Sequence, residues 1–158
     1  MTETEEMRGC ILPKKLYYRI DDHTWIKVGD DGTIWVGMTD VAQSMAGPLL
    51  HVKSRGAGTK RDKGKPLATV ESAKWVGPVK SPVTGEIIEV NPKVAQDAGI
   101  VNQSPYAQGW IVRMKPADLP ADMAEMLTGD AAVEAYRQKI DRDKLKTCVH
   151  VEGFEGEG

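Results

Sequence analysis

The chain has 158 residues, of which 41% are hydrophobic and 28% charged, as expected for one soluble domain with a single core. No apolar run approaches the roughly 18–20 residues that span a bilayer. The N-terminus, MTETEEMRGC, is acidic and polar and lacks the pattern of a signal peptide. These features exclude a membrane-spanning protein and predict a cytoplasmic one.

The net charge of −2 is unevenly distributed along the chain. Between Pro48 and Pro66, six basic residues stand against Asp62 alone, which makes this part +5 and the rest of the chain −7. The basic stretch, residues 53–65, consists of Lys53, Arg55, Lys60, Arg61, Lys63 and Lys65. It is either a contact for an acidic partner or anionic group, or a solvated lysine-rich loop. No aromatic residue is interleaved with these charges, so nucleic-acid binding is not expected.

Short β-type runs dominate the first 115 residues. They are rich in β-branched and aromatic residues, beginning with LYYRI (16–20), TWIKV (24–28) and TIWVG (33–37). The segment GDDG (29–32) predicts a tight hairpin between the last two runs. Further strands are expected at 48–53, 66–72, 82–92 and 104–115, with a surface loop at 54–64. Strands at this spacing favour an all-β barrel or sandwich.

Helices interrupt and follow the strands. Thr39 is a candidate cap and Gly47 a candidate end for a short helix between them. After residue 117 the apolar period changes to that of helices. One helix is predicted over 117–129, and a second is predicted to begin at Asp130. The predicted organisation is an N-terminal extension (1–15), one domain (16–146) and a flexible tail (147–158).

Two cysteines, Cys10 and Cys148, stand near opposite ends of the chain, and neither belongs to a CxxC pair. Zinc sites and thioredoxin-like redox motifs are therefore not supported, and no metal site is expected. The favoured interpretation is that both thiols are unpaired. The alternative is a disulfide with a redox role, which requires the chain ends to meet. The three histidines form no nucleophile–base set, so an independent enzyme is not expected.

Lys74 stands between two strand-like runs in VESAKWVGPVK (70–80), at the tip of a predicted hairpin. A lysine there is exposed, has a flexible stem and carries a primary amine. An enzyme that acylates a lysine needs these properties. Most surface lysines have no specific role, so this position alone does not show that Lys74 is acylated.

From Tyr17 to Tyr136 the chain resembles the H protein of the glycine cleavage system, within the biotinyl/lipoyl-carrier superfamily. Several separate motifs occur in the family's order: YYRIDDHTWIKV (17–28), GMTDVAQSMAGPLLHV (37–52), ESAK (71–74), SPVTGEIIEVN (81–91) and VNQSPYAQGWIVRMKP (101–116). The resemblance implies a mainly β barrel-sandwich hybrid of two antiparallel sheets, with a short inserted helix and C-terminal helices. It also implies lipoic acid in amide linkage to Lys74.

Glu71 and Gly85 match positions by which lipoylating enzymes recognise such domains. Alternatively, Glu71 is a solvated carboxylate at a strand end, and Gly85 is a turn glycine that needs a positive φ. The partners implied are a lipoate-protein ligase or an octanoyl/lipoyl transferase, and a dihydrolipoamide dehydrogenase.

The chain departs from typical H proteins around the lipoyl arm on Lys74. In typical members, two acidic side chains and a histidine hold the cationic amine of the aminomethyl group. Here Thr24 and Pro78 stand at the acidic positions, and Met45 stands at the histidine position. Trp75 follows the lysine where a small residue is usual, and Lys80 adds positive charge.

This pattern is similar to the lipoate-binding proteins of the bacterial sulfur-oxidising heterodisulfide-reductase-like pathway. The favoured function is a non-catalytic lipoyl carrier that moves a sulfur-containing intermediate between cytoplasmic enzymes, including a heterodisulfide-reductase-like complex. The alternatives are an H protein that carries an aminomethyl group, and a non-lipoylated interaction protein.

Overall fold

A computed structural model describes residues 3–157, which form three antiparallel sheets. The first sheet has seven strands in the order β12-β3-β4-β5-β11-β10-β7, the second has the order β6-β8-β9, and the third is the pair β1-β2. The strands are β1 (Thr4–Met7), β2 (Cys10–Pro13), β3 (Tyr17–Arg19), β4 (Thr24–Val28), β5 (Ile34–Met38), β6 (Leu49–Ser54), β7 (Lys60–Arg61), β8 (Pro66–Ser72), β9 (Val76–Lys80), β10 (Gly85–Val90), β11 (Val112–Pro116) and β12 (Leu127–Thr128).

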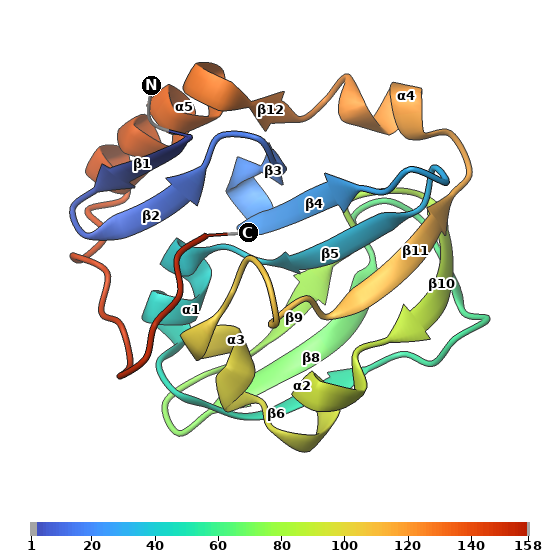
Figure 1. Cartoon of the computed structure of the whole chain (residues 1–158), viewed down its shortest axis with the longest axis horizontal. Helices are drawn as coiled ribbons and strands as arrows, with labels where there is room; N and C mark the ends of the chain where they lie inside the picture. The colour runs from blue at the N-terminus through green and yellow to red at the C-terminus, as the bar shows by residue number, and fades with distance from the viewer. Residues whose placement is uncertain (1–2, 158) are drawn as a thin grey trace.

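The three-stranded sheet lies against the seven-stranded sheet, and the main core fills the space between them (Figure 1). Buried side chains from both sheets meet there, among them Val36, Val70, Ile87 and Met114. The predicted hairpin between β4 and β5 is present, closed by a hydrogen bond from Gly29 N–H to the Thr33 carbonyl at 2.8 Å. The expected mainly β barrel-sandwich fold is confirmed.

Five α-helices and a short 3-10 helix connect the described strands: η1 (Ile20–Asp22), α1 (Asp40–Ala46), α2 (Pro92–Gln96), α3 (Gly99–Gln103), α4 (Leu119–Met123) and α5 (Gly129–Arg142). α1 is the predicted inserted helix. Its cap is Thr39, whose hydroxyl accepts a hydrogen bond from Ala42 N–H at 3.3 Å, and it ends at Gly47 with φ 79°. Within residues 3–157, no helix is long and apolar enough to cross a membrane.

The helix predicted over 117–129 was too long. α4 ends at Met123, and β12 instead pairs with β3, so that Leu127 lies opposite Tyr18. The Thr128 hydroxyl donates to the Leu16 carbonyl at 2.7 Å, a long-range bond that favours extended backbone over another helical turn. The second helix, α5, is present as expected.

The N-terminal hairpin, β1 and β2, and the C-terminal segment after α5 meet beside α1 and α5. β1 and β2 pack near α5, and the C-terminal tail, residues 144–157, returns past β2 toward α1 (Figure 1). Cys10 and Cys148 form a disulfide with Cα atoms 5.0 Å apart. The favoured interpretation of two unpaired cysteines was therefore wrong. The described part of the expected flexible tail contacts the fold, for example through Glu155 N–H, which donates to the Gln103 carbonyl at 2.7 Å.

Candidate functional site

Lys74 lies at the tip of the hairpin formed by β8 and β9, as the sequence predicted. The last pair of the ladder joins Glu71 and Val76, and Ser72 N–H then donates to the Trp75 carbonyl at 2.8 Å. This bond closes a tight turn and leaves the Lys74 side chain exposed. The amine is thus presented away from the core, where a modifying enzyme has access to it.

The C-terminal end of α1 supports this hairpin tip. The buried Ser72 hydroxyl donates a hydrogen bond to the Ala46 carbonyl at 2.5 Å. The same hydroxyl accepts a hydrogen bond from Lys74 N–H at 3.4 Å. A Cβ atom on Gly47 would lie 3.0 Å from Lys74 Cε, so the lysine stem crosses the bare glycine backbone. The sequence prediction assigned no role to Ser72, because its acceptor is 26 residues away in the chain.

A cavity of about 340 Å³ opens beside Lys74, and we call it the tip cavity. It is lined by Asp21, Asp22, His23, Thr24, Met38, Ala42, Met45, Ala46, Trp75, Pro78, Val79 and Lys80. The structure thus brings together the four residues expected around the arm, namely Thr24, Met45, Trp75 and Pro78, from β4, α1 and the hairpin. Most of the lining residues are apolar.

Trp75 forms one wall of the tip cavity. A Cβ atom on Gly77 would lie 2.2 Å from the indole ring of Trp75, so the ring rests on the backbone of β9. Only glycine at position 77 permits this packing. Trp75 remains 41% exposed and offers an apolar surface next to Lys74.

The charges at the tip cavity differ from those expected. Asp21 and Asp22 of η1 line it, because His23 adopts a left-handed conformation with φ 56° and reverses the chain after them. Lys80 lines it, as expected, and lies 3.9 Å from an Asp22 oxygen, whereas no residue of the basic stretch 53–65 lines it. The tip cavity therefore carries charges of both signs, with carboxylates at positions that the sequence comparison did not consider.

His23 connects the tip cavity to the cap of α1. Its Nδ1 lies 2.6 Å from the Tyr136 hydroxyl, which lies 2.6 Å from Thr39 Oγ1. Burial lowers the pKa of His23 to about 4, so the ring is neutral at pH 7 and adds no positive charge. The buried Thr24 hydroxyl has no hydrogen-bond partner within the described part of the chain. The sequence alone could not reveal this chain of contacts, because it joins the end of η1, the cap of α1 and α5.

Glu71 and Gly85 lie at opposite ends of the β8–β9 hairpin. Glu71 is half-buried next to the tip, whereas Gly85 lies beyond the open end, paired with Arg61 and Pro116. Gly85 does not have the positive φ that one interpretation required. A Cβ atom there would lie 2.4 Å from the Lys115 carbonyl oxygen, so close approach of two backbones demands the glycine.

Gly85→Ala is therefore expected to destabilise the protein by roughly 1–3 kcal/mol, because the β10–β11 ladder must shift to relieve the clash. Urea unfolding followed by circular dichroism measures this change. Gly56→Ala is the matched control, since a Cβ on Gly56 meets nothing within 4 Å. Equal stability of the two variants would contradict the steric explanation.

The site fits a lipoyl group on Lys74. The group needs an accessible primary amine for its amide bond and a neighbouring apolar surface for its hydrocarbon and sulfur atoms. The exposed lysine supplies the first, and Met45, Trp75 and the rest of the tip cavity supply the second.

Comparisons with known proteins agree with this geometry. The family model described as "Glycine cleavage H-protein" matches residues 16–140. "Glycine cleavage system H protein 3" of Aquifex aeolicus (strain VF5) is 48% identical over 86% of this chain and 86% of its own length. "Probable glycine cleavage system H protein 2" of Saccharolobus solfataricus is 44% identical over 89% of this chain and 95% of its own. The crystal structure of a glycine cleavage system H protein from Mycobacterium marinum is similar with a TM-score of 0.70 and 29% identity, over 78% of this chain and 98% of that one.

Proposed function

Since the chain belongs to the glycine cleavage H-protein family, a family of lipoate carriers without catalysis of their own, we propose that its lipoyl arm is attached to Lys74 and carries an aminomethyl group. The position of Lys74 in the structure supports attachment of the arm at this residue. The exposed amine stands at a hairpin tip, with its stem across Gly47 and the tip cavity beside it. Lipoate supplies a dithiolane that exchanges with thiols. The protein tethers it, and so raises its concentration at each enzyme that docks.

Two observations support the aminomethyl cargo. The relatives described above are named as glycine cleavage H proteins. In addition, Asp21 and Asp22 line the tip cavity, although Thr24 and Pro78 occupy the positions of the family's usual acidic groups. A carboxylate at the cavity attracts a cationic amine and hydrogen-bonds to it. Asp22 is the better buried of the two, with its side chain 19% exposed against 91% for Asp21.

A reconstituted glycine cleavage assay at full lipoylation tests this function. The wild-type protein is expected to support glycine decarboxylation, and Asp22→Asn is expected to lower the rate about tenfold or more, because a hydrogen bond to a charged group contributes roughly 1.5–3 kcal/mol. Glu89→Gln, an exposed change on β10, is the matched control. A lipoylated wild type without activity, or Asp22→Asn with unchanged activity, would contradict the aminomethyl cargo.

A sulfur-containing cargo is the second candidate. Thr24, Met45 and Pro78 give the cavity fewer polar groups than a typical H protein would have there, and Trp75 adds an apolar wall. The comparisons give no support for a link to sulfur oxidation or to a heterodisulfide-reductase-like complex. A pull-down of the lipoylated protein from its native host separates the two candidates. Recovery of glycine decarboxylase and aminomethyltransferase favours the first, and recovery of a heterodisulfide-reductase-like complex favours the second.

The proposed partners follow from the arm. A lipoate-protein ligase or an octanoyl/lipoyl transferase attaches it, and a dihydrolipoamide dehydrogenase reoxidises it. Glu71, beside the tip, is the better placed of the two proposed recognition residues, since Gly85 lies at the far end of the hairpin. The cytoplasmic location stays a prediction. The remaining alternative, a non-lipoylated interaction protein, predicts an intact mass without the lipoyl increment.

A further inference from the structure

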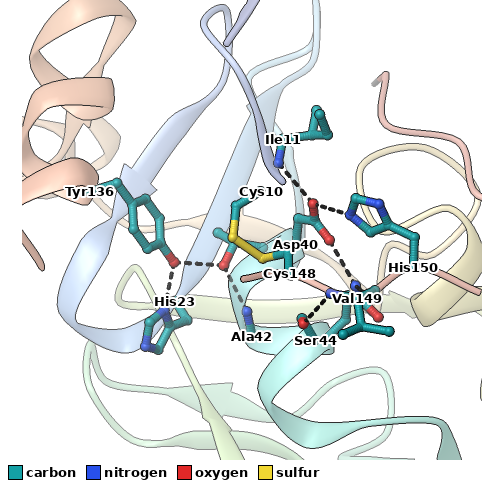
Figure 2. Close-up of a disulfide and its surroundings, with 12 residues drawn as sticks. Cys10, Ile11, His23, Asp40, Ala42, Ser44, Tyr136, Cys148, Val149 and His150 are labelled. Carbon is teal, nitrogen blue, oxygen red and sulfur yellow. Dashed lines mark hydrogen bonds and ion pairs between the residues drawn. A yellow bond between two sulfur atoms is a disulfide. The ribbon is translucent and has the colours of Figure 1, made fainter. Parts of the chain in front are cut away.

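The disulfide joins the tail to the N-terminal hairpin at a buried position. Cys10, the first residue of β2, is 1% exposed, and Cys148 in the tail is 8% exposed. Cys148 N–H also donates to the Arg8 carbonyl at 3.0 Å. Figure 2 shows the sulfur atoms between β2 and the tail, next to the start of α1. The crosslink therefore fixes the part of the tail that runs along α1.

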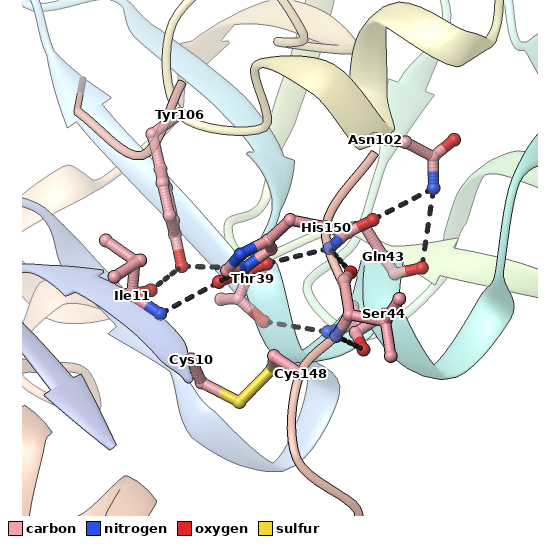
Figure 3. A network of polar contacts seen from close by, with 12 residues as sticks. Cys10, Ile11, Thr39, Gln43, Ser44, Asn102, Tyr106, Cys148 and His150 are labelled. Atoms are coloured by element: carbon pink, nitrogen blue, oxygen red, sulfur yellow. Dashed lines mark hydrogen bonds and ion pairs between the residues drawn. A yellow bond between two sulfur atoms is a disulfide. The ribbon is translucent and has the colours of Figure 1, made fainter. Parts of the chain in front are cut away.

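The two residues after Cys148 bind α1 directly (Figure 2), and Gln43 and Ser44 of α1 are seen beside the tail in Figure 3. Val149 N–H donates to the Ser44 hydroxyl at 2.7 Å, and Gln43 Nε2 donates to the Val149 carbonyl at 3.1 Å. The His150 Nε2 lies 2.7 Å from Asp40 Oδ2, and it must donate because a carboxylate only accepts. Asp40 is completely buried, so loss of this donor leaves a buried carboxylate with fewer partners.

α1 in turn supports the hairpin tip and the tip cavity. While Asp40, Gln43 and Ser44 bind the tail, Ala42, Met45 and Ala46 line the tip cavity. The Ala46 carbonyl accepts the hydrogen bond from the Ser72 hydroxyl that anchors the tip. A helix of seven residues has little stability of its own and depends on its contacts. One short helix thus connects the disulfide-bonded tail to the segment that presents Lys74.

We propose that the Cys10–Cys148 disulfide is a redox site for a dithiol reductant, and that its reduction releases the tail from α1 and loosens the hairpin tip around Lys74. Without the crosslink, the tail is joined covalently to the fold only through α5, and its hydrogen bonds to α1 alone hold a chain end that opens readily. The two states are the tail bound along α1 and the tail released.

The dithiol supplies the electrons and protons for this reduction by thiol–disulfide exchange. One thiolate of the reductant attacks the sulfur of Cys148 and displaces the Cys10 thiolate, which leaves a mixed disulfide. The second thiolate of the reductant then closes a cyclic disulfide and releases the Cys148 thiolate. Two electrons and two protons pass from the dithiol to the protein, which gains two cysteine thiols. Because both sulfurs are buried, local opening of the tail precedes the attack.

Hydrogen exchange with mass spectrometry on the unlipoylated full chain, before and after treatment with dithiothreitol, tests the proposal. Thiol titration should find two thiols per treated chain, while circular dichroism shows that the fold is retained. Amide exchange is expected to rise about tenfold or more in the tail, and several-fold in residues 39–47 and 70–76. The β4–β5 hairpin should not change.

The double variant Cys10→Ala/Cys148→Ala is the matched control. It should exchange like the reduced wild type and should not respond to dithiothreitol. Two results would overturn the proposal: a folded protein whose disulfide resists the dithiol, or faster exchange in the tail alone with α1 and the tip unchanged. The measurement uses protein without the arm, so its outcome is independent of whether Lys74 is lipoylated and of the cargo.

Discussion

Lys74→Arg is expected to abolish the lipoyl arm completely. Arginine keeps the positive charge and the length of the side chain, but it lacks the primary amine that forms the amide bond. The hairpin tip should tolerate the change, because the side chain is exposed and the tip is held by the Ser72 hydroxyl and backbone bonds. The fold therefore survives while the carrier function is lost.

Reduction of the arm by dihydrolipoamide dehydrogenase and NADH measures this loss after incubation with a lipoate-protein ligase. The wild type should consume at least one NADH per chain, and Lys74→Arg none. Lys53→Arg, another exposed lysine on a strand, should behave like the wild type. NADH consumption by the Lys74→Arg variant would show that the arm is attached elsewhere.

Cys148→Ala is expected to lower the free energy of unfolding by about 5 kcal/mol under oxidising conditions. The bonded cysteines are 138 residues apart in sequence, and the chain-entropy model assigns roughly this stabilisation to a crosslink that closes so long a loop. Urea unfolding of the oxidised wild type and of the variant measures the difference.

Two further variants distinguish the stabilisation by the crosslink from that by the cysteine side chains themselves. Cys10→Ala alone should cost about as much as Cys148→Ala, and the double variant should cost little more than either, because both single changes break the same bond. A loss below about 1 kcal/mol in the single variants would mean that the crosslink adds little to the stability of the folded chain.

Elements with a local cause were predictable from the sequence. The β4–β5 hairpin follows from GDDG between two β-rich runs, and α1 follows from Thr39 and Gly47, a cap and a terminator. The tip position of Lys74 likewise follows from the strands on either side of it. In each case, residues within one short segment determine the conformation.

Features that depend on distant residues were not predictable. The disulfide requires α5 and the tail to bring Cys148 back to β2, and no local pattern records that path. β12 exists because Leu127 pairs with Tyr18, although its own sequence continues a helical pattern. In both cases a tertiary contact decides the structure, and the local sequence is ambiguous.

The candidate site was predicted in part. The family resemblance placed Thr24, Met45 and Pro78 around the arm, and all three line the tip cavity. However, it compared charges only at the aligned positions. It did not consider Asp21 and Asp22, because only the reversal of the chain at His23 places their η1 turn at the cavity. The charge around the arm depends on this turn as well as on the aligned positions.

The central claim is that Lys74 carries the lipoyl group, and the most direct test is a peptide map with intact-mass measurement of the protein purified from its native host. The mass should exceed that of the unmodified chain by a single lipoyl increment, and the modified peptide should contain Lys74. A lipoyl group on any other lysine, or a chain that stays unmodified in cells whose other lipoyl proteins are modified, would contradict the account.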